Sequence, residues 1–151
     1  GQTADASPKT DGYLHLKRTW KGGDIVELDL PMPVKRVYAH EKVKADAGKT
    51  ALMRGPIVYC LEAVDHPEAD LSRIVLPPKA NLQTEHREKL LGGVTVIQGQ
   101  ALVDGKSVKM TAVPYYAWAN RDRGAMEVWV NESPAKAPAP KKQKTSRGEI
   151  K

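Results

Sequence analysis

Two short apolar runs near the end of the chain, residues 113–119 and 125–130, constrain the fold more than any other feature. They lie in the stretch AVPYYAWANRDRGAMEVWV, residues 112–130, which holds two of the three Trp and two of the five Tyr. The polar loop between the two runs contains Gly124, which can supply the positive φ that a hairpin loop needs. The pattern therefore predicts a β-hairpin over residues 113–130.

Pairing Ala119 with Ala125 divides the side chains of this expected hairpin between two faces, because side chains alternate along a strand. One face is expected to be core and holds Tyr116, Trp118, Met126, Val128 and Val130. The other face holds Tyr115, Glu127 and Trp129. A slip of one residue in the pairing would exchange the two faces.

The rest of the chain shows the same short apolar runs broken by Gly and Pro. Strands are expected at residues 13–19, 25–30, 34–39, 50–54, 56–63 and 74–76, in a strand pair or bulged strand at 93–102, and from residue 106 into the hairpin. Residues 79–91 have helical propensity but only a thin apolar face, which favours strand and loop. Strands at this spacing indicate an all-β fold, an antiparallel β-sandwich of the jelly-roll type or a barrel.

Charge is concentrated at the end of the chain. Its 24 Lys and Arg outnumber 18 Asp and Glu, but the segment from Ser133 onward carries six of the bases and only one acid, Glu149. The preceding residues are nearly neutral, which argues against a nucleic-acid partner. Residues 132–151, rich in Ala, Pro and Lys, are expected to be disordered. No apolar run is long enough for a membrane span, so no membrane partner is expected.

Neither catalysis nor metal binding has a strong sequence signal. The single Cys60 lies inside an apolar run and is expected to be a buried structural thiol, and no His or Cys pair has metal-ligand spacing. Glu27 and Asp29 would lie on one strand face about 7 Å apart, a separation that suits glycosidase chemistry but also any solvated face. We therefore assign no catalytic and no metal-binding residues and keep this carboxylate pair as a weak alternative.

The outer face of the expected hairpin is the candidate binding site. Tyr115 and Trp129 could form a platform on which a sugar ring stacks, with Glu127 or Asn120 accepting a hydroxyl proton. The alternative is that this face packs against another domain.

Four segments resemble glycoside hydrolase family 127, the β-L-arabinofuranosidase family formerly known as a domain of unknown function. They are GGDIVELDLPMPVKRV (22–37), KTALMRGPIVYCLEAVD (49–65), LLGGVTVIQG (90–99) and VPYYAWANRDRGAMEVWV (113–130). Members of that family look like an (α/α)6 catalytic barrel followed by two β-sandwiches, and this chain resembles the sandwich region only. The resemblance implies that the cysteine nucleophile and a zinc ion belong to the barrel, so neither role transfers to Cys60.

Composition and resemblance together give a domain plan. The small polar residues 1–12 would be a linker or truncated element, and residues 132–151 are the tail. The resemblance implies that residues 13–65 are part of a first sandwich and residues 66–131 a second sandwich. The chain begins with Gly, and its first Met is Met32, so we expect a piece of a longer protein whose compartment stays open. The expected function is a non-catalytic accessory region that supports a barrel outside this chain; the alternative is a carbohydrate-binding module. Unpaired strand edges would also favour a homodimer.

Overall fold

The strands of the protein gather in one of two compact units. The computed structural model describes residues 9–133, and the chain divides into a unit of residues 1–30 and a unit of residues 31–151. Eight strands lie in the second unit: β1 (Val34–Val37), β2 (Lys49–Arg54), β3 (Ile57–Glu62), β4 (Gln83–Arg87), β5 (Val94–Val103), β6 (Lys106–Pro114), β7 (Met126–Glu127) and β8 (Val130–Asn131). Four short 3-10 helices lie between them: η1 (Lys44–Asp46), η2 (Ala63–Asp65), η3 (Leu71–Arg73) and η4 (Tyr115–Ala117).

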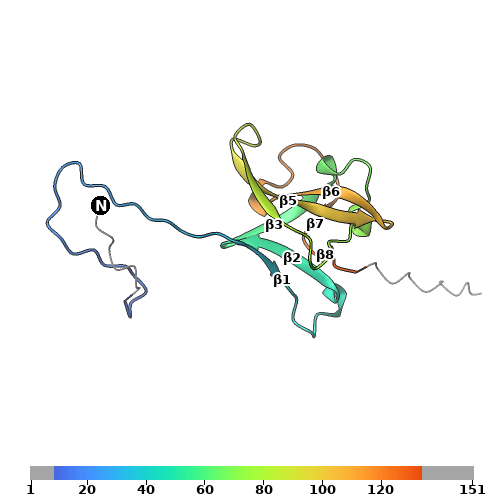
Figure 1. Ribbon diagram of the computed structural model, residues 1–151, viewed down its shortest axis with the longest axis horizontal. Coiled ribbons are helices and arrows are strands. Elements are labelled where there is room, and N and C mark those ends of the chain that lie inside the picture. Colours follow the sequence, from blue (N-terminus) through green and yellow to red (C-terminus); the bar gives the residue numbers. More distant parts are fainter. Residues whose placement is uncertain (1–8, 134–151) are drawn as a thin grey trace, which may run out of the picture. The chain divides into compact units, whose positions relative to one another are not determined.

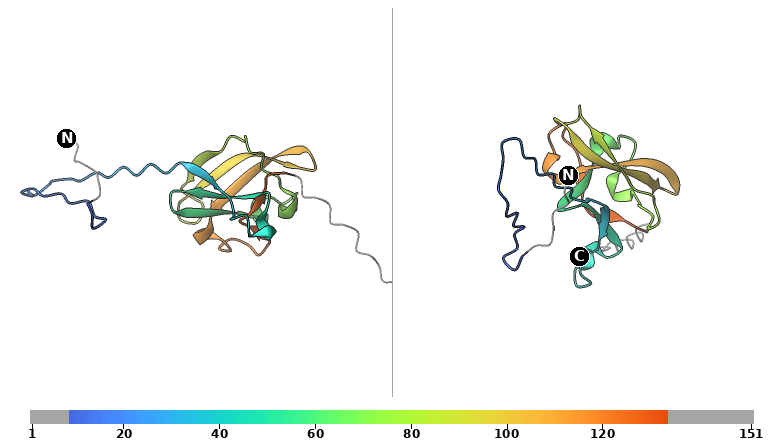
Figure 2. Two further views of the ribbon diagram at one scale, coloured as in Figure 1. Left: turned by 90° about the horizontal axis from the view of Figure 1, so that it is seen from below. Right: turned by 60° about the vertical axis from the view of Figure 1, so that its left-hand side comes forward.

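The strands form one strongly bent antiparallel sheet. Its order is β1-β2-β3-β6-β5-β4, while β7 adds to β3 and β8 adds to β2. Every pairing between named strands is antiparallel. In Figure 1, β5 and β6 lie in one layer and β1 and β2 in another, with β3 passing between them. Figure 2 shows the same bend from below. The expected all-β antiparallel sandwich is therefore confirmed.

Glycines explain where the two long hairpins turn. Gly55 connects β2 to β3 with a φ of +56°, a conformation that L side chains rarely adopt. Asp104 and Gly105 connect β5 to β6 with φ values of +52° and +78°. Two consecutive positive φ values are typical of the type I′ turn, whose twist matches that of a hairpin.

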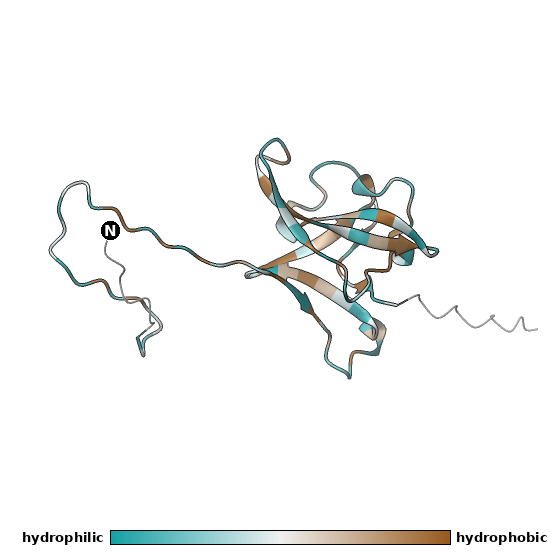
Figure 3. Cartoon of the chain, in the orientation of Figure 1, coloured by the Kyte–Doolittle hydropathy of each residue, from teal (hydrophilic) through white to brown (hydrophobic). Residues whose placement is uncertain are grey.

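Alternating side chains build a hydrophobic cluster on each face of the sheet. The larger cluster includes Tyr59 and Leu61 of β3, Ile97 of β5 and Met110 of β6. The smaller cluster takes the intervening residues, namely Cys60, Val94, Val96, Val113 and Ala117. Figure 3 shows apolar bands along these strands. The middle of β3 is thus buried on both sides, as its continuous apolar run predicts.

The hairpin expected over residues 113–130 is wrong. β6 ends at Pro114, the chain turns through η4, and β7 pairs with β3 through Leu61 and Glu127. β8 then pairs with β2, where Thr50 faces Val130. The backbone groups of residues 126–131 bond to strands from much earlier in the chain, so the two apolar runs do not pair with each other.

The strands expected at residues 13–19 and 25–30 are also absent from the described part of the first unit, which consists of irregular segments with a few turns and bends. A strand needs a neighbour for its backbone ladder, and residues 9–30 offer none to one another. The alternating pattern there is real, but alternation alone does not make a strand.

The boundary between the two units differs from the expected one at residues 65 and 66. Leu61 pairs with Ala112, so strands from both sides of that position share one sheet. We place the division between residues 30 and 31. Residues 79–91 contain β4, as the thin apolar face predicted, whereas residues 74–76 make only isolated bridges. The expectations for residues 1–8 and 134–151 lie outside the described residues.

Candidate functional site

The loop that joins β6 to β7 carries the most unusual chemistry of the described chain. Residues 115–120, which we call the aromatic loop, display Tyr115, Tyr116 and Trp118 at the surface. The rings of Tyr115 and Trp118 are stacked, with centroids 6.0 Å apart and planes inclined by 22°. The stack follows from η4, because a 3-10 turn brings residues three apart onto the same side.

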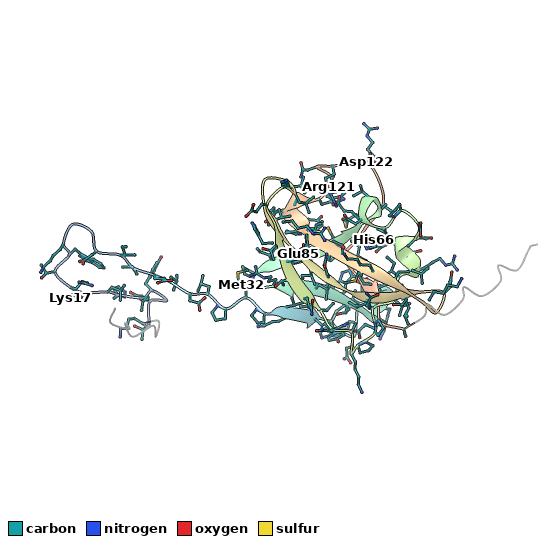
Figure 4. The ribbon with its side chains drawn as sticks, turned by 45° about the horizontal axis from the view of Figure 1, so that its top comes forward. Lys17, Met32, His66, Glu85, Arg121 and Asp122 are labelled. Carbon is teal, nitrogen blue, oxygen red and sulfur yellow. The ribbon has the colours of Figure 1, made fainter. Side chains whose placement is uncertain are left out.

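A buried group of charges holds this loop against the sheet. Glu62, at the end of β3, accepts a hydrogen bond from the Ala119 backbone N–H at 3.0 Å and one from Arg121 Nη2 at 2.5 Å. Asp65, at the end of η2, accepts two further bonds from the same guanidinium, at 2.8 Å and 2.5 Å. We call Glu62, Asp65 and Arg121 the anchor. Figure 4 shows Arg121 and Asp122 at one end of the sheet.

Arg121 offsets one of the two negative charges in the anchor. The hydrogen bonds that Arg121 donates to Asp65 raise the pKa of its guanidinium, burial lowers it, and the bond donated to Glu62 raises it further. The guanidinium therefore stays charged and lies between two carboxylates that are both nearly inaccessible to water. Each of the four carboxylate oxygens accepts a hydrogen bond from the Ala119 N–H or from the Arg121 guanidinium. Because these bonds occupy both acids, neither is placed to act on a ligand.

His66 comes directly after Asp65 of the anchor in the sequence, and its side chain is buried. Its Nε2 accepts the Thr111 backbone N–H at 3.2 Å, so the ring proton lies on Nδ1 and is donated to the Glu62 carbonyl oxygen at 2.8 Å. The ring therefore joins the end of β3 to β6. This is a structural use of histidine, which leaves no ring atom for a ligand.

Cys60 is buried in the smaller hydrophobic cluster. Burial raises the pKa of its thiol to about 12, and the nearby Glu62 adds to the shift. A thiol that stays protonated at neutral pH is a poor nucleophile, since the thiolate is the reactive form. The geometry supports the structural role expected for this residue.

The sequence-predicted sugar platform is not assembled as expected. Tyr115 stacks on Trp118, which the hairpin pattern had assigned to the core, and not on Trp129. Glu127 is half-buried in β7, and Asn120 uses its side-chain amide to bond the carbonyl oxygens of Ala117 and Trp118. The i, i+3 spacing after a proline is the signal that could have identified Trp118.

The alternative carboxylate pair, Glu27 and Asp29, lies in the first unit, where the described residues form no strand. The strand face that would have set their separation is therefore missing. Among residues 9–133, no three His, Cys, Asp or Glu side chains gather where they could hold a metal ion. These residues do not fit a zinc ion, so no chemical step is derived through one in this chain. None of the helices in that range is long and apolar enough to cross a membrane.

Comparison with known proteins extends these observations. The model of the glycoside hydrolase family 127 C-terminal domain matches residues 34–131, and that of the GH127 β-L-arabinofuranosidase middle domain matches residues 1–32. The two matches meet between residues 32 and 34, close to the division between the two units after residue 30. They define the sheet of the second unit as a β-sandwich domain of a glycoside hydrolase. The chain belongs to glycoside hydrolase family 127.

Individual relatives agree with the family match. A non-reducing end β-L-arabinofuranosidase of Bifidobacterium longum is 37% identical over 142 residues, covering 79% of this chain and 21% of that protein. The crystal structure of a GH127 β-L-arabinofuranosidase from Geobacillus stearothermophilus T6 is 46% identical, covers 68% of this chain and 19% of its own, and has a TM-score of 0.63. A GH127 β-arabinofuranosidase is 39% identical with a TM-score of 0.70, over 82% of this chain and 21% of that chain. The chain thus spans about a fifth of the length of these relatives.

Proposed function

We propose that this chain is the non-catalytic accessory β-sandwich region of a glycoside hydrolase of family 127. Its role is to support a catalytic barrel outside this chain, which is its main partner and which hydrolyses β-L-arabinofuranosides or related glycosides. The match of residues 34–131 to the family's C-terminal domain carries this proposal. The names of two relatives as β-L-arabinofuranosidases support the substrate class.

The chemistry of the second unit favours a non-catalytic, accessory role. Its buried carboxylates, Glu62 and Asp65, are committed to Arg121, and its one thiol is buried and held protonated. Glycoside hydrolysis needs two carboxylates, or a nucleophile and an acid, that flank a bound sugar. We place the zinc ion implied by the family resemblance in the barrel, together with the nucleophilic cysteine.

A chimera tests the proposal. Residues 31–133 would replace the corresponding C-terminal domain of the Bifidobacterium longum relative, and hydrolysis of p-nitrophenyl β-L-arabinofuranoside would be measured. We expect the relative to lose soluble, active protein when its own domain is deleted and to regain both in the chimera. A matched control carries an unrelated β-sandwich of similar size and should not restore activity.

The 151-residue chain alone should give no turnover of the same substrate. Turnover that survives both Cys60→Ala and Glu27→Gln would overturn the accessory role. A chimera no better than the unrelated sandwich would overturn the claim that this domain supports the barrel.

A further inference from the structure

The aromatic loop is an exposed surface that the sheet does not need for its own core. Tyr115, Tyr116 and Trp118 are 45%, 67% and 40% exposed, whereas their neighbour Ala117 is buried and joins the smaller cluster. Large aromatic side chains left in water cost free energy that burial against a partner would recover. Three of them on four consecutive residues therefore call for a partner.

The rings form a flat apolar area. Those of Tyr115 and Trp118 are nearly parallel, and their centroids are 6.0 Å apart. Parallel rings in contact are about 3.5 Å apart in the perpendicular direction, so these two must be displaced sideways, and each leaves part of its face open. Such a stepped area suits a ligand with flat, C–H-lined faces of similar size.

The loop is ordered before any partner arrives. The Ala119 N–H bonds to Glu62, the Trp118 N–H bonds to the Tyr115 carbonyl oxygen, and Asn120 closes the turn onto Ala117 and Trp118. Ala119 has a φ of +61°, a strained conformation for a residue other than glycine, and the Glu62 bond helps to hold it there. Binding would therefore not have to order the loop, which lowers its entropic cost.

Polar groups border the rings and add little net charge. The hydroxyls of Tyr115 and Tyr116 and the indole N–H of Trp118 make no hydrogen bond to any described residue. Arg121 carries one positive charge against the two negative charges of Glu62 and Asp65, so the anchor has a formal charge of −1, and the charges of Asp122 and Arg123 oppose each other. The surface thus offers ring faces and hydrogen-bonding groups beside a small negative charge, which disfavours an anionic ligand and suits an uncharged one.

We propose that the aromatic loop binds an uncharged oligosaccharide, with a sugar ring stacked on Trp118 and Tyr115. The C–H face of a sugar ring matches the stepped area, and its hydroxyls match the unpaired phenol and indole groups. The proposal uses Trp118 in place of Trp129 and leaves Glu127 outside the contact. It is independent of whether the domain supports a barrel.

Titration of arabinotriose into the 151-residue chain, followed by tryptophan fluorescence and calorimetry, tests the proposal. We expect saturable binding in the millimolar range, weakened roughly tenfold or more by Trp118→Ala and by Tyr115→Ala. The matched control is Tyr38→Ala, which removes a 58% exposed tyrosine from outside the loop and should leave binding unchanged. Trigalacturonate, which is anionic, should bind more weakly than arabinotriose.

Three results would overturn the proposal. They are the absence of saturable binding, affinity that Trp118→Ala leaves intact, and preference for trigalacturonate. Thermal unfolding of each variant separates a lost contact from a lost fold, and Trp118→Phe, which keeps a ring, should recover part of the affinity. If the chain binds no sugar but Trp118→Ala disperses an oligomer, the loop is a protein-docking surface and the proposal fails. None of these results changes the outcome expected for the chimera with the Bifidobacterium longum relative, so the two proposals can fail separately.

Discussion

The backbone N–H of Ala119 donates a hydrogen bond to the buried carboxylate of Glu62, 57 residues earlier in the chain. The bond ties an exposed aromatic loop to the end of a central strand. Without it, the carboxylate would be buried with only Arg121 for a partner, and the loop would lose its fixed end.

Removing the Glu62 carboxylate should destabilise the second unit strongly. Glu62→Ala leaves the Ala119 N–H unpaired and Arg121 with Asp65 as its carboxylate partner, and we expect it to lower the free energy of unfolding by about 1.5–3 kcal/mol. Glu62→Gln can still accept the Ala119 N–H and should cost less. Urea denaturation measures both. Arg73→Ala breaks the exposed Arg73–Asp104 ion pair and serves as the control, with an expected loss of about 1 kcal/mol or less. Equal losses for Glu62→Ala and Arg73→Ala would show that the anchor is not a stabilising element.

The thiol of Cys60 should make stability fall at high pH. Burial raises its pKa from 9.0 to about 12, so between these values the unfolded chain has released a proton that the folded chain retains. The free energy of unfolding therefore decreases as pH rises above 9, since the folded state binds more protons there. Urea titrations from pH 8 to about pH 11 should show a shallower decrease for Cys60→Ala than for the parent chain. Parallel curves would contradict the shift.

Two glycines should respond to alanine for different reasons. At Gly99 a Cβ would lie 2.8 Å from Leu82 Cδ2 and 3.2 Å from the Asn81 carbonyl oxygen, so Gly99→Ala should lower stability by about 1–3 kcal/mol through crowding. At Gly105 a Cβ would meet nothing within 4 Å, but φ is +78°, so Gly105→Ala should cost about 1 kcal/mol through the backbone alone. Replacing Leu82 with Ala should offset part of the Gly99→Ala loss and none of the Gly105→Ala loss. Thermal denaturation of the double variants checks this, and an equal rescue of both would disprove the distinction.

Residues 13–30 should make the isolated chain self-associate. Ile25 is 88% exposed, and Leu28 and Leu30 are 64% and 65% exposed, on a segment whose backbone has no strand partner among the described residues. Apolar side chains and unpaired backbone groups together favour pairing with a second copy. Light scattering should give a mass above that of a monomer for the full chain and a monomeric mass after residues 1–30 are deleted. A monomeric full chain would argue against the homodimer expected from the sequence.

Local patterns predicted the strands well and their partners poorly. The alternating or continuous apolar runs at residues 34–37, 49–54 and 57–62 are strands. The run at residues 126–130 has equally good strand character, but it pairs with β3 and β2 rather than with its neighbour in sequence. Pairing partners depend on contacts between distant segments, which a local pattern does not encode.

The candidate site was predicted only in part, because its geometry also depends on contacts between distant segments. The sequence correctly indicated that Tyr115 is an exposed aromatic residue. Its expected neighbour on the platform was Trp129, because the hairpin placed both on one face, whereas its ring stacks on Trp118. The anchor was missed, because Glu62, Asp65 and Arg121 meet only after β3 and β6 have paired.

The pairing of β8 with β2 also sets the order in which the domain can be completed during synthesis. Lys49 and Thr50 leave the ribosome long before Val130 and Asn131, so part of the β2 edge stays open while the intervening chain is translated. Folding that depends on such distant pairing is slow and leaves a nascent chain exposed to aggregation. The domain is therefore expected to depend on chaperones, or on slow translation, until its last strand has emerged.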